Sequence, residues 1–132
     1  MDVAMRLQTI ATRQGWAMVR GHDGSARIEV RTEYGRTQVV NITLGHDPDR
    51  RPLAWIWSVV CQTSAIGDPY YLLRLNADLP YGALAVRDPN VILVESQLVQ
   101  TADDEELMRA VYYVAKYADD LEKQVHGNVD KN

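Results

Sequence analysis

The order of helix-like and strand-like segments constrains the fold of this chain more than any single motif does. Three segments with the two-residue alternation of strands follow one another, at 26–31, 37–44 and 53–63. A helical pattern at 2–14 precedes them. Another helix at 70–77, strands at 82–87 and 91–99, and a helix from 104 to about 125 follow them. Strands joined by short turns pair antiparallel. We therefore expect an α+β fold in the order α-β-β-β-α-β-β-α, with helices packed on a single five-stranded antiparallel sheet. A short strand starting at Trp16 would add a sixth.

The size and composition fit one domain. A chain of 132 residues that is 46% hydrophobic and 24% charged resembles an ordinary globular domain. We assign residues 1–126 to a single α+β domain and expect 127–132 to be a frayed polar tail. The N-terminal residues lack the cationic and apolar regions of a signal peptide, and no 18-residue apolar stretch is present. We expect a cytoplasmic protein, because the single cysteine, Cys61, cannot form an internal disulfide.

The segment 53–63 is apolar on both of its faces. Leu53, Trp55, Trp57, Val59 and Cys61 alternate with Ala54, Ile56, Ser58 and Val60. A strand of this kind is typical of the centre of a sheet covered on both sides. If the helices cover one side only, another copy of the chain could cover the second.

The last helix has a regular apolar stripe, and its start carries acidic residues. Residues recurring at three- and four-residue steps predict the core-facing side of the helix: Leu107, Val111, Val114, Ala118, Leu121 and Val125. Thr101 is the predicted N-cap, and the carboxylates at 103–106 suit the positive end of the helix dipole. Asp68 followed by Pro69 predicts the start of the preceding helix.

The charge pattern disfavours nucleic acid as a partner. The formal net charge is -4, and the 11 arginines are scattered, with Arg50-Arg51 as the only adjacent pair. Phosphate recognition requires a concentrated cationic face. We therefore predict neither nucleic-acid nor membrane binding.

Residues that could support chemistry have structural explanations of their own. Histidine and aspartate in Gly21-His22-Asp23 and Gly45-His46-Asp47 could bind a metal, but both triplets stand at predicted turns and lack a third ligand. Cys61 ends an apolar strand, which favours a packed, unreactive thiol. No phosphate-binding loop, nucleophile elbow or zinc-protease helix is present. We predict no catalytic residues, no metal and no cofactor.

Aromatic residues are the remaining candidates for an interface. Trp55 and Trp57 share a strand face, and Tyr112, Tyr113 and Tyr117 lie beside the stripe of the last helix. Tryptophan and tyrosine are enriched at interface hot spots. In a chain without phenylalanine they also serve as core residues, and the sequence leaves both interpretations open.

The same element order resembles the type III secretion chaperone-like fold of CesT-type chaperones and YbjN-type proteins. The resemblance covers nearly the whole chain. It lies in the hydrophobic patterns of Tyr71-Leu72-Leu73-Arg74-Leu75-Asn76, Gly82-Ala83-Leu84-Ala85-Val86, Val91-Ile92-Leu93-Val94-Glu95-Ser96 and the acidic-start helix at 104–121.

The resemblance implies a non-enzymatic homodimer that binds a partner protein or peptide. By position, the implied dimer interface consists of Tyr70, Leu72, Leu73, Leu75, Leu84 and Val86. The implied partner-binding residues are Leu7, Ile10, Val30 and Val40. The alternative is a small-ligand-binding or regulatory domain with a pocket between the sheet and the helices and His46 or Trp57 at its mouth. An enzyme is the third hypothesis.

Overall fold

The computed structural model describes residues 2–33 and 35–130. Helix α1 (Val3–Gln14) precedes four strands: β1 (Ala17–Arg20), β2 (Ala26–Glu33), β3 (Arg36–His46) and β4 (Pro52–Gln62). A short 3-10 helix, η1 (Thr63–Ala65), leads to helix α2 (Pro69–Asn76), strands β5 (Ala83–Arg87) and β6 (Asn90–Leu98), and helix α3 (Asp104–Asp130). The predicted α+β class is confirmed, and the short N-terminal strand is present as β1.

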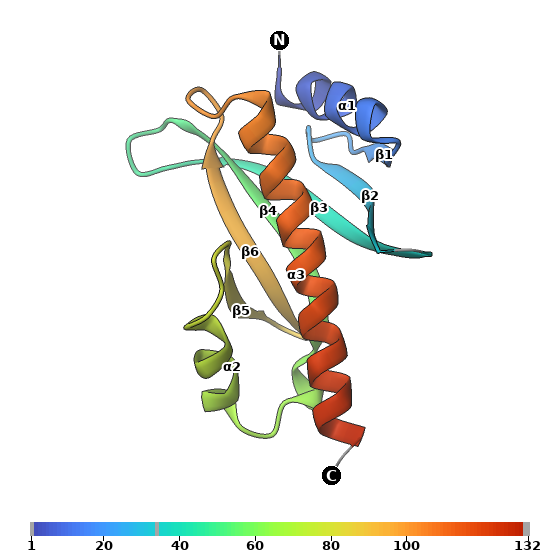
Figure 1. The fold of residues 1–132 in the computed structure, drawn as a ribbon. Coiled ribbons are helices and arrows are strands. Elements are labelled where there is room, and N and C mark those ends of the chain that lie inside the picture. Colours follow the sequence, from blue (N-terminus) through green and yellow to red (C-terminus); the bar gives the residue numbers. More distant parts are fainter. Residues whose placement is uncertain (1, 34, 131–132) are drawn as a thin grey trace.

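The six strands form one sheet in the order β1-β2-β3-β4-β6-β5, with each strand antiparallel to its neighbours. Figure 1 shows α3 running along the length of the sheet, with α1 beside β1 and β2 and with α2 near β5. Strand β4 is central, as its two apolar faces predicted. In the described part of the chain, however, all three helices pack on one face of the sheet.

We call the helix-covered face of the sheet the inner face. It supplies the hydrophobic core, in two clusters. One joins α1 and the first half of α3 to β2, β3 and the start of β4. The other joins α2 and the second half of α3 to β5, β6 and the end of β4. The six stripe residues predicted for the last helix are all buried members of these clusters: Leu107, Val111, Val114, Ala118, Leu121 and Val125.

We call the opposite side of the sheet the outer face, and the strand registers identify its members. No segment within residues 2–33 and 35–130 covers the outer face (Figure 1). The covering expected on both faces of β4 is therefore present on the inner face only. The side chains of the outer face alternate with those of the core: Ala17, Val19, Arg27, Glu29, Arg31, Val39, Asn41, Thr43, Leu53, Trp55, Trp57, Val59, Ala83, Ala85, Arg87, Ile92, Val94 and Ser96.

Strands β3 and β4 are paired along only part of their length. The ladder runs from Asn41 opposite Trp57 to His46 opposite Pro52. Between Asn41 and the start of β3, side-chain hydrogen bonds replace the backbone pairing to β4. Gln38 Nε2 donates to Ser58 Oγ (2.9 Å) and to the Val59 carbonyl (3.1 Å), and Ser58 Oγ donates to the Val39 carbonyl (2.6 Å). Carbonyl groups that a continuous ladder would pair are thus satisfied by side chains.

The helix starts were predicted in part. Asp68 caps α2, because its carboxylate accepts a hydrogen bond from the Tyr70 amide (3.0 Å). The cap predicted at Thr101 is wrong. Asp103 occupies this position, since its carboxylate accepts from the Glu106 amide (2.8 Å), three residues ahead.

The ends of the chain differ from the prediction in extent. Helix α3 continues to Asp130, beyond its predicted end near Val125, so the segment predicted as a tail begins as helix. Met1, Lys131 and Asn132 belong to the predicted domain and tail but lie outside the described residues.

Candidate interaction surfaces

Exposed apolar side chains lie on α2 and on the neighbouring edge strand β5. Tyr70, Leu73 and Val86 are 69%, 62% and 58% exposed, and among the large hydrophobic residues whose side chains the structure describes only Val19 has a comparable value. A hollow of about 180 Å³ adjoins them, lined by Pro69, Leu72, Val86, Val91 and neighbouring residues. The outer edge of β5 has no strand partner within the described residues. The structure thus gathers apolar surface and an unpaired strand edge at one end of the sheet.

The six residues predicted for a dimer interface all belong to this region but differ in exposure. Leu72 and Leu84 are buried, and Leu75 is partly buried, so these three hold α2 against the core. Asn76 strengthens this junction. Its side chain accepts a hydrogen bond from the Leu84 amide (2.6 Å) and donates to the Leu84 carbonyl (3.3 Å).

The residues predicted to bind a partner lie inside the molecule. Leu7, Ile10, Val30 and Val40 are at most 3% exposed and belong to one core cluster. Helix α1 packs its apolar face on the sheet, and this packing accounts for their hydrophobicity. A partner could reach these side chains only if α1 left the sheet, and the assignment stays a prediction.

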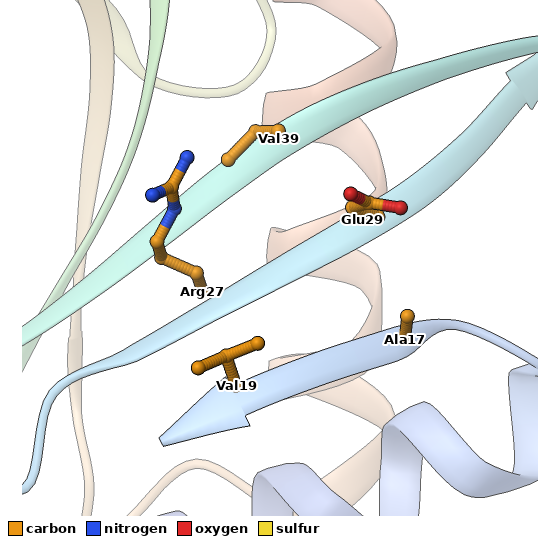
Figure 2. Close-up of a pocket in the computed structure, with 5 residues that line it drawn as sticks. All are labelled: Ala17, Val19, Arg27, Glu29 and Val39. Carbon is orange, nitrogen blue, oxygen red and sulfur yellow. The ribbon is translucent and has the colours of Figure 1, made fainter. Parts of the chain in front are cut away.

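The outer face has a shallow hollow at its β1–β2–β3 end. Figure 2 shows the five residues that line it, Ala17, Val19, Arg27, Glu29 and Val39, which all project from the same side of the three strands. Its volume is about 260 Å³. A second hollow of about 430 Å³ shares Arg27 and Val39 with the first and extends past Asn41 to Val59, where β3 and β4 separate. Most of its lining is polar, and it reaches through this separation to Glu122 of α3. The two hollows therefore adjoin and reach from β1 to β4.

Tryptophans occupy the middle of the outer face. Trp55 is 42% exposed, and Trp57 is partly buried. The indole Nε1 of Trp57 donates to Thr43 Oγ1 (3.1 Å). The Arg87 guanidinium carbon lies 5.4 Å from the centre of the Trp57 ring, within the range of a cation–π contact. In this chain the two tryptophans lie outside the helix-covered core.

The tyrosines of α3 pack within the chain. The Tyr113 ring stacks on that of Tyr81 with centroids 4.8 Å apart, and it also contacts Tyr112 and Tyr117 at 5.2 and 6.0 Å. The rings of α3 are partly buried in this arrangement.

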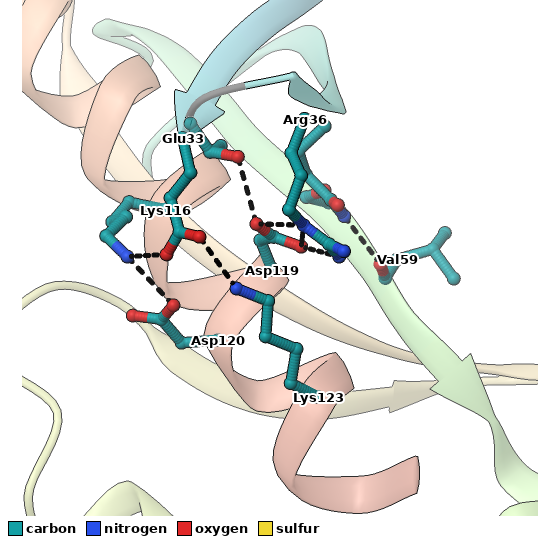
Figure 3. Close-up of polar contacts among 10 residues, drawn as sticks. Glu33, Arg36, Val59, Lys116, Asp119, Asp120 and Lys123 are labelled. Carbon is teal, nitrogen blue, oxygen red and sulfur yellow. Dashed lines mark hydrogen bonds and ion pairs between the residues drawn. The ribbon is translucent and has the colours of Figure 1, made fainter.

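An ion pair between the partly exposed Arg36 and the buried Asp119 connects the β2–β3 hairpin to α3. The Arg36 guanidinium donates to the Asp119 carboxylate, with Nη2 2.6 Å from Oδ1, and Thr32 Oγ1 donates to Oδ2 at 2.9 Å (Figure 3). Asp119 is fully buried, whereas the Arg36 side chain is 45% exposed. The hydrogen bonds from Arg36, and next the one from Thr32, hold the pKa of the Asp119 carboxyl below its usual value.

A second group of charges surrounds this pair nearer the surface. Glu33 accepts from Lys116 Nζ (2.9 Å) and Lys123 Nζ (3.0 Å), and Lys116 also donates to Asp120 (2.9 Å), as Figure 3 shows. These charges satisfy one another, which indicates a structural role rather than a reactive centre.

The two histidine–aspartate triplets organise turns, as their structural explanation predicted. Asp23 accepts from the Ser25 amide and hydroxyl (3.0 and 2.6 Å), and Gly24 has a φ of +85°. Asp47 accepts from the Asp49 and Arg51 amides (2.9 and 2.8 Å) and from Arg51 Nε (2.7 Å). No group of three or more His, Cys, Asp or Glu side chains that could hold a metal occurs among the described residues.

Two further groups have a raised pKa and no evident chemical role. Burial raises the pKa of the Cys61 thiol, which is 7% exposed. Burial likewise raises the pKa of Glu95, whose Oε2 has no hydrogen-bond partner among the described residues. Neither side chain is joined to a neighbouring base or nucleophile by a hydrogen bond in the described part of the chain.

Sequence reasoning missed Asp119, Arg27 and Arg87. The stripe around Asp119 predicted core positions but gave no sign that a carboxylate would be buried among them. Arg27 lies in the alternating segment 26–31, but the hollows beside it are also built from β1 and β3, which no local pattern places there. Arg87 and Trp57 stand 30 positions apart, and only the pairing of β4, β6 and β5 places them together.

These features define an α+β protein with one antiparallel sheet, all described helices on one face and open surface on the other. No helix in the described residues is long and apolar enough to cross a membrane. The chain belongs to the YbjN family, whose model matches residues 4–126 and is described as "Putative bacterial sensory transduction regulator". The predicted resemblance to YbjN-type proteins is confirmed. Comparison with curated proteins gave no significant match.

Proposed function

We propose that this chain is a non-enzymatic, homodimeric, cytoplasmic regulator that acts by binding another protein or peptide. The observation that supports this most directly is the exposure of Tyr70, Leu73 and Val86 on the adjacent elements α2 and β5, which we call the α2–β5 patch. Large apolar side chains exposed together mark interaction sites more often than ordinary surface. The family description, a regulator rather than an enzyme, agrees with this proposal.

In the proposed dimer, α2 and β5 of one subunit contact the same elements of the other. Such a two-fold interface uses one patch twice, so the patch must be self-complementary. Apolar side chains meet this requirement, because Leu73 and Val86 of two copies bury one another without leaving an unpaired charge. Buried Leu72 and Leu84 would then support the interface from beneath.

Molar mass in solution tests the dimer. Wild-type protein at micromolar concentration should have twice the 14.9 kDa of one chain by light scattering. Leu73→Asp should reduce it to one chain, since each interface would receive two buried carboxylates. Met5→Asp is the matched control, because Met5 is also apolar and exposed but belongs to α1, and this variant should remain dimeric.

The far-ultraviolet circular dichroism spectra of both variants should match that of the wild type, which separates loss of the interface from loss of the fold. A monomeric wild type, or two variants with the same mass, would contradict the proposed α2–β5 dimer.

A further inference from the structure

The outer face differs in charge from the rest of the molecule. Its charged side chains are Arg27, Arg31, Arg87 and Glu29, a net charge of +2 from three arginines and one glutamate. The whole chain has a net charge of -4, so the remaining residues together carry -6. Positive charge is therefore gathered on the one face that no described helix covers.

The arginines of this face are not engaged by carboxylates. Five other arginines form ion pairs with Asp or Glu: Arg6, Arg36, Arg51, Arg74 and Arg109. Among the described residues, Arg27, Arg31 and Arg87 form none. Arg87 instead lies over the Trp57 ring. Guanidinium groups bind carboxylates well, often through two parallel hydrogen bonds.

Apolar side chains lie beside these charges. Ala17, Val19 and Val39 line the hollow next to Arg27 and Glu29 (Figure 2). The adjoining hollow reaches Val59 but is mostly polar, with Thr37, Gln38, Asn41 and Glu122 in its lining. Trp55, exposed to 42%, lies further along β4. The surface therefore offers one shallow apolar depression next to arginines that form no ion pair among the described residues.

From this arrangement we propose that the outer face binds a segment of a partner polypeptide that combines apolar and acidic side chains. The apolar side chains occupy the hollow lined by Ala17, Val19 and Val39, and the carboxylates pair with Arg27 and Arg87. This inference rests on the proposed protein-binding function and names the surface and the partner chemistry for it. It does not depend on the α2–β5 dimer.

Charge argues against the two other occupants. Two copies of the chain placed face to face would bring six arginines together with only two glutamates. A nucleic acid would require a stronger positive field than a face of net charge +2 supplies, and the Trp57 ring available for base stacking already contacts Arg87.

A displayed library of random peptides, selected on the intact protein, tests the proposal. Enriched peptides should combine Asp or Glu with apolar residues, and they should bind more weakly as salt is added. Arg27→Glu should weaken binding of a labelled enriched peptide at least about tenfold, because it replaces an attraction by a repulsion. Arg13→Glu is the matched control: it makes the same charge change on the exposed end of α1 and should leave the affinity unchanged.

Several outcomes would overturn the proposal. These are failure to enrich any sequence, enrichment of basic peptides, or equal effects of Arg27→Glu and Arg13→Glu. Single-stranded RNA that binds the wild type as tightly as the selected peptides would point to nucleic acid. A fall to the mass of one chain on Arg27→Glu would make the outer face a contact between copies.

The Leu73→Asp variant separates this inference from the dimer. If it is monomeric and still binds the selected peptides, both proposals stand. If the wild type is monomeric yet binds them through Arg27, the dimer fails and the outer-face site remains. If the wild type is dimeric but no peptide is enriched, the dimer remains and the outer-face site fails.

Discussion

Replacement of Asp119 by asparagine should destabilise the protein far more than the same change at the next residue. Asp119 is fully buried and accepts hydrogen bonds from Arg36 and Thr32, whereas the Asp120 side chain is 40% exposed and contacts Lys116. Breaking a buried ion pair costs about 3–5 kcal/mol, and hydrogen bonds to charged groups are worth roughly 1.5–3 kcal/mol each.

For Asp119→Asn we expect a loss of stability below that of a fully buried ion pair. Asparagine keeps one acceptor oxygen for Thr32 Oγ1, and the partly exposed Arg36 regains water when the charge is lost. We expect the free energy of unfolding to fall by about 2–3 kcal/mol. Asp120→Asn should lower it by less than about 1 kcal/mol, as is usual for exposed ion pairs.

Urea denaturation followed by circular dichroism measures the free energy of unfolding of both variants. The pH dependence of that free energy provides an independent check. Because folding lowers the pKa of Asp119, its carboxylate stabilises the folded state fully above the unfolded-state pKa of about 4. That contribution is lost as the pH falls through the lower pKa of the folded state. The difference between wild type and Asp119→Asn should therefore shrink below about pH 4. Equal midpoint shifts for the two variants at pH 7, or a difference independent of pH, would refute this reasoning.

Two further predictions concern the core. Val111→Ala removes two methyl groups from a fully buried site and should lower the free energy of unfolding by about 1–3 kcal/mol. Urea denaturation measures this change, and an unchanged urea midpoint would mean that the site tolerates the cavity. Cys61 should react with a thiol reagent at pH 8 much more slowly in the folded protein than in urea. Burial limits access of the reagent and raises the pKa of the thiol. Equal reaction rates would show that the thiol is accessible in the folded protein.

Periodicity predicted the elements well because each core position repeats a local pattern. The alternation in 53–63 placed Trp55 and Trp57 on one face, and the stripe from Leu107 to Val125 identified the buried side of α3. The N-cap of α3 was predicted wrongly because two nearby residues are equally suitable for that position. Thr101 and Asp103 are both good N-caps, and only the geometry of the preceding turn selects Asp103.

The candidate surfaces were less predictable because they depend on which elements meet. Leu7 and Val30 have the composition of either a core or a binding surface, and the docking of α1 on the sheet buries them both. The isolation of Asp119 from water depends on Thr32 and Arg36, more than 80 positions away. No spacing within α3 indicates such a contact.

The incomplete ladder between β3 and β4 divides the sheet into units of different local stability. Past Asn41, the β2–β3 hairpin is joined to β4 through Gln38 and Ser58, and to α3 through Asp119. Side-chain contacts of this kind can break without disrupting the continuous pairing of β4, β6 and β5, so the hairpin tip forms its own opening unit. Amide hydrogens of this tip should therefore exchange with solvent through a local opening, at a lower free energy than those of β4 and β6. Because Val39 and Val59 lie on the two sides of this separation, an opening of the tip should widen the second hollow.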